Sequence, residues 1–193
     1  RLINLSLYVL TKMYIYKLKW TRLHNEIFRV LCIKTGVLLN QRRIAILLGV
    51  SPTAVSKALK ELNEDNLIEI KKDANMNLIT IELNRENEKA INLKRTEILK
   101  IIYESKLVNI LEEKFPGTTI LLFGSYSKGE DTTKSDIDIA IIGVKEKKIN
   151  LEKFDKMFER EIIIHFYKNW KEIGKNLKNN ILNGIVLTGG IEI

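Results

Sequence analysis

Two aspartates near the middle of the chain, Asp136 and Asp138, are separated by one apolar residue and lead into an apolar run. If this segment is a strand, side chains two residues apart share a face, so the carboxylates start roughly 6–7 Å apart. Each carboxylate raises the cost of ionising the other, and the apolar run buries the pair in part. A hard divalent cation is the usual way to keep two such carboxylates ionised. The spacing therefore predicts a metal site.

A Gly-Ser pair upstream, Gly124 and Ser125, supplies the complementary chemistry. It interrupts an apolar run at residues 119–123 that is expected to be a strand. Free backbone N–H groups and a hydroxyl at a turn or helix start can hold phosphate oxygens. A phosphate-binding turn followed by a metal site indicates nucleotide chemistry.

Gly124-Ser125, ten residues and then Asp136-x-Asp138 resembles the signature of the polymerase beta-like nucleotidyltransferase superfamily. The intervening segment also resembles the minimal branch of that superfamily, which has a basic residue at the position of Lys128 and glycine after it. The resemblance implies an NTP substrate, with ATP favoured, and Mg²⁺ or Mn²⁺ held by the two aspartates. It further implies that the Gly-Ser turn binds the triphosphate and that Lys128 adds a positive charge there.

The resemblance also implies a third carboxylate on a later strand beside the Asp-x-Asp strand, where it completes the metal site or activates the acceptor. The strand expected at residues 161–167 opens with Glu161, to which we assign the catalytic and metal-binding roles. The superfamily has Asp in the middle of this strand, so Glu161 departs from the pattern. His165 shares the expected face and is the alternative proton acceptor, although a half-buried strand histidine without chemistry fits equally well.

The elements expected around these residues follow the order of the minimal nucleotidyltransferases. Residues 85–114 carry helical apolar spacing and are stopped by Phe115-Pro-Gly. Strand, Gly-Ser turn and Asp-x-Asp strand follow, and the last residues are expected to form a helix end and a short strand. We therefore divide the chain into a domain at 1–84, a helical connection at 85–116 and a nucleotidyltransferase domain at 117–193.

Positive charge is concentrated in the first half of the chain. Residues 1–85 contain 14 basic and 7 acidic residues, a net charge of +7, whereas residues 86–193 contain 18 and 17, a net charge of +1. Such asymmetry indicates that the N-terminal part meets a polyanion.

The pattern of the N-terminal half predicts a winged helix-turn-helix. Helices are expected at 20–34, 41–48 and 52–63, with Gly36 stopping the first. Gly49 marks the turn, Ser51 is the expected N-cap of the third helix, and Pro52 is its first residue. Two strands around a basic, turn-rich tip at 71–77 form the expected wing. The fold class is therefore α+β, a winged helix-turn-helix followed by a small mixed sheet.

The outward side of the third helix and the wing carry the residues that we assign to DNA binding. Polar and basic side chains of this kind suit phosphates and base edges in a major groove. They are Thr53, Ser56, Lys57, Lys60, Lys71 and Lys72. The alternative is that this unit serves dimerisation or contact with another protein.

Composition also bears on the cellular compartment and on whether the chain crosses a membrane. The sequence is 45% hydrophobic, and its single cysteine, Cys32, lies in an apolar helical run, which favours a buried thiol in a reducing cytoplasm. Residues 2–10 are apolar but too few to span a membrane. Core packing or contact within a homodimer is the expected role of that segment.

Taken with the resemblance, these patterns predict an Mg²⁺-dependent enzyme that transfers NMP, with AMP favoured, to an acceptor hydroxyl, and a winged helix that localises or regulates it on DNA. The acceptor includes the option of a protein. The competing hypothesis is a transcription regulator whose nucleotidyltransferase domain only senses nucleotide. A third is antitoxin-like modification of a partner protein.

Overall fold

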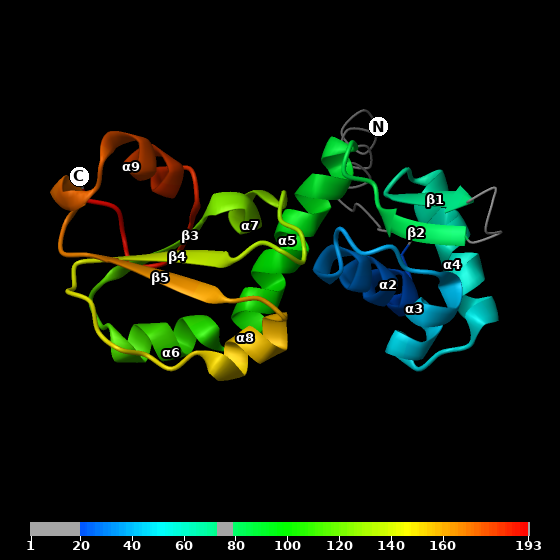
Figure 1. The fold of residues 1–193 in the computed structure, drawn as a ribbon, viewed down its shortest axis with the longest axis horizontal. Coiled ribbons are helices and arrows are strands. Elements are labelled where there is room, and N and C mark those ends of the chain that lie inside the picture. Colours follow the sequence, from blue (N-terminus) through cyan, green and yellow to red (C-terminus); the bar gives the residue numbers. More distant parts are fainter. Residues whose placement is uncertain (1–19, 73–78, 193) are drawn as a thin grey trace, which may run out of the picture.

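The computed structural model describes residues 20–72 and 79–192, which form two regions joined by a long helix, α5 (Glu88–Glu104) (Figure 1). The predictions for residues 2–10 and for most of the wing tip lie outside the described residues. Within them, no helix is long and apolar enough to cross a bilayer.

The N-terminal region contains three helices followed by a two-stranded antiparallel hairpin, as predicted. The elements are α2 (Arg22–Ile33), α3 (Gln41–Leu48), α4 (Pro52–Glu64), β1 (Ile68–Lys72) and β2 (Ile79–Leu83). Leu39, between α2 and α3, exchanges backbone hydrogen bonds with Ile81 and so adds a third chain segment to the hairpin. This is the arrangement of a winged helix-turn-helix.

Local signals explain where these helices begin and end. Asn40 caps α3 by accepting a hydrogen bond from the Arg43 N–H, and Gly49 ends α3 at φ +65°, where glycine is unstrained. Ser51 then caps α4 by accepting from the Ala54 N–H, and Pro52 occupies the first helical position. The turn predicted from Gly49, Ser51 and Pro52 is thus confirmed.

A shared hydrophobic core fixes how α2, α3 and α4 pack. Ile27, Ile44 and Val55, one from each helix, are fully buried. Ala45 is buried as well, which lets α3 and α4 approach closely. Cys32 belongs to the same core, as predicted, and burial raises the pKa of its thiol. A protonated, buried thiol is a packing group.

Helix α5 belongs to both cores. Ala90, near its start, is buried in the winged-helix core, whereas Ile98 and Ile102 are buried in the core of the C-terminal region. The shorter α6 (Leu107–Lys114) follows and packs in the second core. The 85–116 connection is therefore two helices, and its first helix spans the boundary between the regions (Figure 1).

The C-terminal region is built on a mixed four-stranded sheet in the order β5-β4-β3-β6. Its strands are β3 (Thr119–Phe123), β4 (Ile137–Ile142), β5 (Ile162–Tyr167) and β6 (Ile185–Thr188). β4 and β5 are parallel, and β3 is antiparallel to both β4 and β6. This confirms the predicted position of the later strand beside the Asp-x-Asp strand.

The two faces of the sheet are covered unequally. One face packs on α5, α6 and α8 (Glu152–Phe158) through the largest hydrophobic cluster of the region. The other packs on α9 (Lys175–Leu182) and on the buried Trp170 of the short helix η1 (Trp170–Glu172). Figure 1 shows α6 and α8 on one side of the strands and α9 on the other. Asp138 and His165 alternate with residues of the larger cluster and therefore lie on the α9 face.

Candidate active site

The Gly-Ser turn lies directly at the end of β3. Helix α7 (Gly124–Lys128) begins at Gly124, whose φ of +73° is a conformation that residues with a Cβ rarely adopt. A Cβ at this position would lie 2.6 Å from Oδ2 of Asp138. Glycine is therefore required twice, once for the backbone conformation and once because the Asp138 carboxylate occupies the space beside it.

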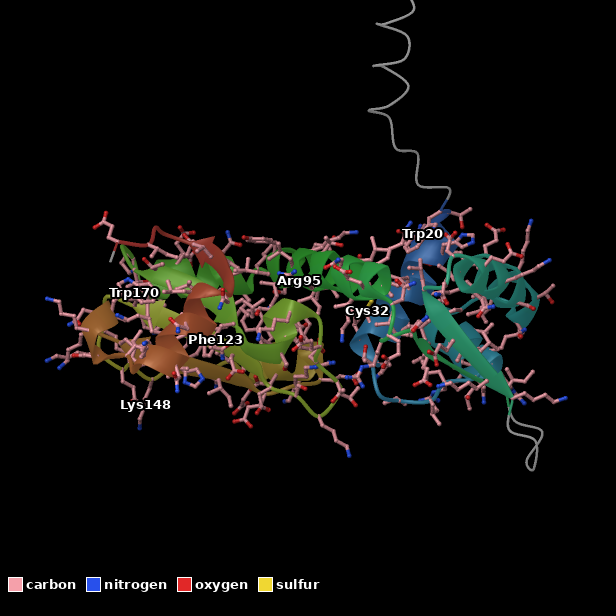
Figure 2. The ribbon with its side chains drawn as sticks, turned by 90° about the horizontal axis from the view of Figure 1, so that it is seen from above. Trp20, Cys32, Arg95, Phe123, Lys148 and Trp170 are labelled. Atoms are coloured by element: carbon pink, nitrogen blue, oxygen red, sulfur yellow. The ribbon has the colours of Figure 1, made fainter. Side chains whose placement is uncertain are left out.

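Several hydrogen bonds hold this turn in place. The Ser127 hydroxyl donates to the Gly124 carbonyl (2.9 Å), and the Glu130 N–H donates to the Ser125 carbonyl (3.0 Å). From α5, Arg95 Nε donates to the Ser127 carbonyl (3.1 Å). Figure 2 shows Arg95 on α5, between Phe123 of the sheet and the winged-helix region. Lys128, the last residue of α7, is exposed.

The two aspartates occupy different positions relative to β4. Asp138 lies within the strand, pairs with Phe123 of β3 and has a side chain 30% exposed. Asp136 is exposed and precedes β4, which starts at Ile137, so the strand begins one residue later than predicted. Both carboxylates are thus reachable from solvent at the end of the sheet that bears the Gly-Ser turn.

On the neighbouring strand, the structure brings His165 to Asp138. His165 Nε2 lies 3.1 Å from Asp138 Oδ1, and the imidazole packs edge-on against Phe123 with ring centroids 5.2 Å apart. In the register of β4 and β5, Ile163 is opposite Asp138 and His165 is opposite Ala140. No carboxylate stands at either of these β5 positions.

Glu161 lies one residue before the start of β5, outside the strand. Its carbonyl accepts a hydrogen bond from the Ile137 N–H, which fixes its backbone beside the start of β4. Its side chain is exposed and lines a surface cavity with the 146–152 segment and with Ile162, Ile164 and Phe166. Its assignment as the third carboxylate stays a prediction.

In the winged-helix region, the α4 residues assigned to DNA binding form one exposed polar face. Thr53, Ser56 and Lys57 are exposed, as is Lys60, whose ammonium lies 3.9 Å from Glu64 one helical turn away. The wing lysine Lys71 is different because it pairs with two glutamates.

Lys71 Nζ lies 2.6 Å from a carboxylate oxygen of Glu69 and 2.8 Å from one of Glu82. Hydrogen bonds to Glu69 and then Glu82 raise the pKa of Lys71. Its charge is therefore partly neutralised within the wing. Lys72, the next residue, is exposed.

A buried charged cluster that no sequence pattern predicted lies beside the site. Three almost completely buried residues form it: Lys94 of α5 and Arg160 before β5 both pair with Asp131 of the loop after α7. These residues are 29–66 positions apart in the chain, so no spacing rule connects them. The only signal was Asp131 itself, an additional acidic residue between the Gly-Ser and Asp-x-Asp motifs.

Comparison with known proteins agrees with this geometry. A family model described as "Nucleotidyltransferase domain" matches residues 104–188. The Putative protein adenylyltransferase MJ1547 of Methanocaldococcus jannaschii is 33% identical in an alignment covering 34% of this chain and 80% of that protein. The Putative protein adenylyltransferase MJ1379 of the same organism is 46% identical over 24% of this chain and 44% of its own length.

Among solved structures, the chain is similar to a zinc-responsive MarR family member, ZitR of Lactococcus lactis. The two are 26% identical, 58% of this chain and 83% of that chain are covered, and the TM-score is 0.39. At that score the likeness is partial, and the winged-helix assignment rests on the three helices and hairpin described above.

The matched region begins at the end of α5 and contains the whole sheet, the Gly-Ser turn and both aspartates. Gly124 ends β3 and lies against the carboxylate of Asp138 on the paired strand β4, so the structure brings the two motifs of the resemblance together. The chain therefore belongs to the polymerase beta-like nucleotidyltransferase family and carries a winged helix-turn-helix ahead of that domain.

Proposed function

We propose that the protein transfers NMP from an NTP, with ATP as the first candidate, to an acceptor hydroxyl. The observation that carries this proposal is the position of Asp138 Oδ2 against Gly124, because it joins the metal-binding and phosphate-binding motifs at one point. Relatives named as protein adenylyltransferases support AMP as the transferred group and a protein as the acceptor.

Asp136 and Asp138 suit Mg²⁺ or Mn²⁺. Among residues 20–72 and 79–192, no three His, Cys, Asp or Glu side chains gather as a ligand set. Mg²⁺ does not need one, since it commonly takes one or two carboxylates and completes its shell with substrate phosphates and water. When bound, the cation supplies positive charge that offsets the charge developing on the triphosphate.

The chain's own groups bind and orient the nucleotide. The backbone N–H groups of the Gly124 turn and the Ser125 hydroxyl donate to phosphate oxygens, and Lys128 adds a mobile positive charge. Gly124 keeps the turn close to the Asp138 carboxylate, so Asp136 and Asp138 would hold the cation beside the bound triphosphate. The hydrogen bonds from Ser127 and Arg95 hold residues 124–127 of the turn in place.

The acceptor proton has two candidate destinations on this chain. His165 is favoured by its contact with Asp138, which holds the imidazole at the site. Glu161 is the alternative because its backbone lies beside the start of β4. Replacing each residue separately by Gln distinguishes them: only loss of the true acceptor lowers the transfer rate without weakening ATP binding.

We also propose that the winged helix binds duplex DNA. The support is the exposed face of α4, with Thr53, Ser56, Lys57 and Lys60, together with the net charge of +7 on residues 1–85. Such a face suits phosphates and base edges in the major groove. DNA binding would bring the nucleotidyltransferase to its acceptor or regulate it.

The transfer reaction is tested with α-labelled ATP and Mg²⁺, without and with extracts containing candidate acceptors. The expected result is label on an acceptor and release of pyrophosphate, both abolished by EDTA and by Asp138→Asn. Glu113→Gln is the matched control, because it makes the same charge change at an exposed position on α6. Label that persists in Asp138→Asn would overturn the assignment.

A second candidate function is a regulator that binds nucleotide without transferring it. The observation that favours it is the pair Ile163 and His165 at the β5 positions beside Asp138, where the family resemblance led us to expect a carboxylate. This candidate predicts ATP binding that requires Asp138 but produces no pyrophosphate with any acceptor. Calorimetry and pyrophosphate release on the same samples separate the two functions.

A further inference from the structure

Asp131 is a buried anion in the loop between the two motifs. This loop, residues 129–136, leaves α7 and delivers Asp136 to the start of β4. Lys94 Nζ lies 2.7 Å from Asp131 Oδ1 and donates to the Asp131 carbonyl (2.6 Å), and Arg160 Nη2 donates to Oδ2 (3.0 Å). The loop is therefore held from α5 on one side and from the start of β5 on the other.

Burying these three charged side chains costs desolvation free energy. Asp131 is 1% and Lys94 0% exposed, and burial lowers the pKa of Lys94 although Asp131 opposes that change. Apolar residues of similar size fill such positions at least as stably, so buried ion groups are weak evidence for stability. In some proteins such buried ion pairs instead favour one arrangement of the segments that carry them.

The same cluster reaches into the winged-helix region. Arg160 Nη2, which binds Asp131, also donates to the carbonyl of Ile33 at the end of α2 (3.0 Å). Two residues later, the Thr35 carbonyl accepts from the Thr133 N–H (2.9 Å). Between them, Lys34 pairs with Glu159. The three consecutive residues 33–35, at the end of α2 and just after it, thus contact either the 129–136 loop, called here the catalytic loop, or residues 159–160, of which Arg160 holds that loop through Asp131.

Helix α2 in turn packs on α4, the helix to which we assign DNA binding. α2 and α4 share the core formed by Ile27, Leu31, Val55 and Leu59. His24 Nε2 of α2 lies 3.2 Å from a carboxylate oxygen of Glu61 on α4. In Figure 2 the labelled Cys32 of α2 lies where the winged-helix region meets α5. A continuous set of packed groups therefore runs from the exposed face of α4 to Asp136.

We propose that Lys94, Asp131 and Arg160 are positioning residues through which the winged helix sets the catalytic loop, so that DNA on α4 and nucleotide at Gly124–Asp138 strengthen each other's binding. This inference rests on the proposed function. DNA restrains α4 and hence α2; the Ile33 carbonyl of α2 holds Arg160, and the Thr35 carbonyl just after α2 holds Thr133 of the loop. Nucleotide then binds a loop that is already ordered, and less conformational entropy is lost.

The test measures both affinities on the full chain. Duplex DNA binding is followed by fluorescence anisotropy at fixed ionic strength, with and without Mg²⁺ and a non-transferable ATP analogue. Binding of the analogue is followed by calorimetry with and without saturating DNA. We expect each ligand to tighten the other by the same factor, about fivefold or more, because linkage is reciprocal.

Arg160→Lys tests the route. It keeps the positive charge but removes the guanidinium that reaches Ile33 and Asp131 together. We expect the coupling factor to fall toward one while DNA and the analogue each still bind. Glu130→Gln is the control, an exposed carboxylate next to Asp131, and keeps the wild-type factor. Circular dichroism melting verifies that each variant is folded.

The outcomes are distinct. A wild-type protein that binds both ligands with a coupling factor of one overturns this inference and leaves the proposed function standing. Wild-type coupling that survives in folded Arg160→Lys overturns the assigned route. A protein that binds no DNA or no nucleotide overturns the proposed function, and this inference with it. The wild-type measurement decides the first case even if Arg160→Lys fails to fold.

Discussion

Asp131 and Asp138 lie seven residues apart yet stand in opposite environments. Asp131 is 1% exposed, with Lys94 and Arg160 both within 3.0 Å of its carboxylate. Asp138 has a side chain 30% exposed and a single hydrogen-bond partner, His165, among the described residues. Its other oxygen faces the space at Gly124 that a side chain would fill.

The difference indicates that Asp131 has a structural role and that Asp138 is available to bind a ligand. Asp131 has one carboxylate oxygen against Lys94 and the other against Arg160, is closed to solvent, and fixes the loop that contains it. Asp138 is partly exposed and contacts only His165 among the described residues, so its oxygens keep lone pairs that can bind a cation. We therefore expect substitutions at Asp131 to change stability and positioning, and those at Asp138 to change chemistry.

The largest expected effect is loss of transfer in Asp138→Asn. Under the proposed function Asp138 holds the cation, and removing its charge then forfeits several kcal/mol of transition-state stabilisation, so the rate should fall by about 10³-fold or more. The melting temperature should change little, because the side chain is partly exposed. Labelled-ATP transfer and thermal melting on the same sample check both parts. An unfolded Asp138→Asn protein would erase the contrast with Asp131.

Asp131→Ala should instead destabilise the fold, by about 3–5 kcal/mol, because it leaves Lys94 and Arg160 buried without a counter-charge. The measurement is urea unfolding at constant pH. Glu130→Ala, one residue away and exposed, should stay within about 0.5 kcal/mol of wild type. Equal unfolding free energies for the two variants would show that the buried cluster does not contribute to the stability of the fold.

Gly124→Ala is expected to damage the site more than the fold. A left-handed residue with a Cβ costs about 1–2 kcal/mol, and here the methyl group also meets Asp138 Oδ2. Gly117→Ala is the matched control, since Gly117 has φ +74° with open space beside it. Both variants should lose similar stability in urea unfolding. Only Gly124→Ala should lose transfer, by about tenfold or more, a loss worth about 1.4 kcal/mol.

The smallest effects should come from single lysines of the winged helix. Lys57→Ala should weaken DNA binding and reduce the slope of log affinity against log salt by about one. Lys71→Ala should do less, because Glu69 and Glu82 already pair with that lysine. Anisotropy titrations over a range of salt concentrations measure both slopes. A larger change in slope for Lys71→Ala than for Lys57→Ala would indicate that the wing, and not α4, contacts the DNA.

Much of this fold could be predicted because its signals are local. Gly49, Ser51 and Pro52 marked the turn between α3 and α4, and the Gly-Ser and Asp-x-Asp spacing marked the two central strands. The contact of His165 with Asp138 depended on the register of two parallel strands, which no local pattern fixes. The buried Lys94–Asp131–Arg160 cluster depended on three distant segments meeting, so the sequence alone could not show it.

The most direct test of the account is a crystal of the protein soaked with Mn²⁺ and a non-transferable ATP analogue. The account predicts an anomalous manganese peak in contact with Asp136 and Asp138, with the triphosphate at the Gly124–Ser125 turn. Asp131 should keep its contacts with Lys94 and Arg160 and bind no metal. Manganese and nucleotide bound elsewhere, with Asp138 still paired only to His165, would contradict the central claim.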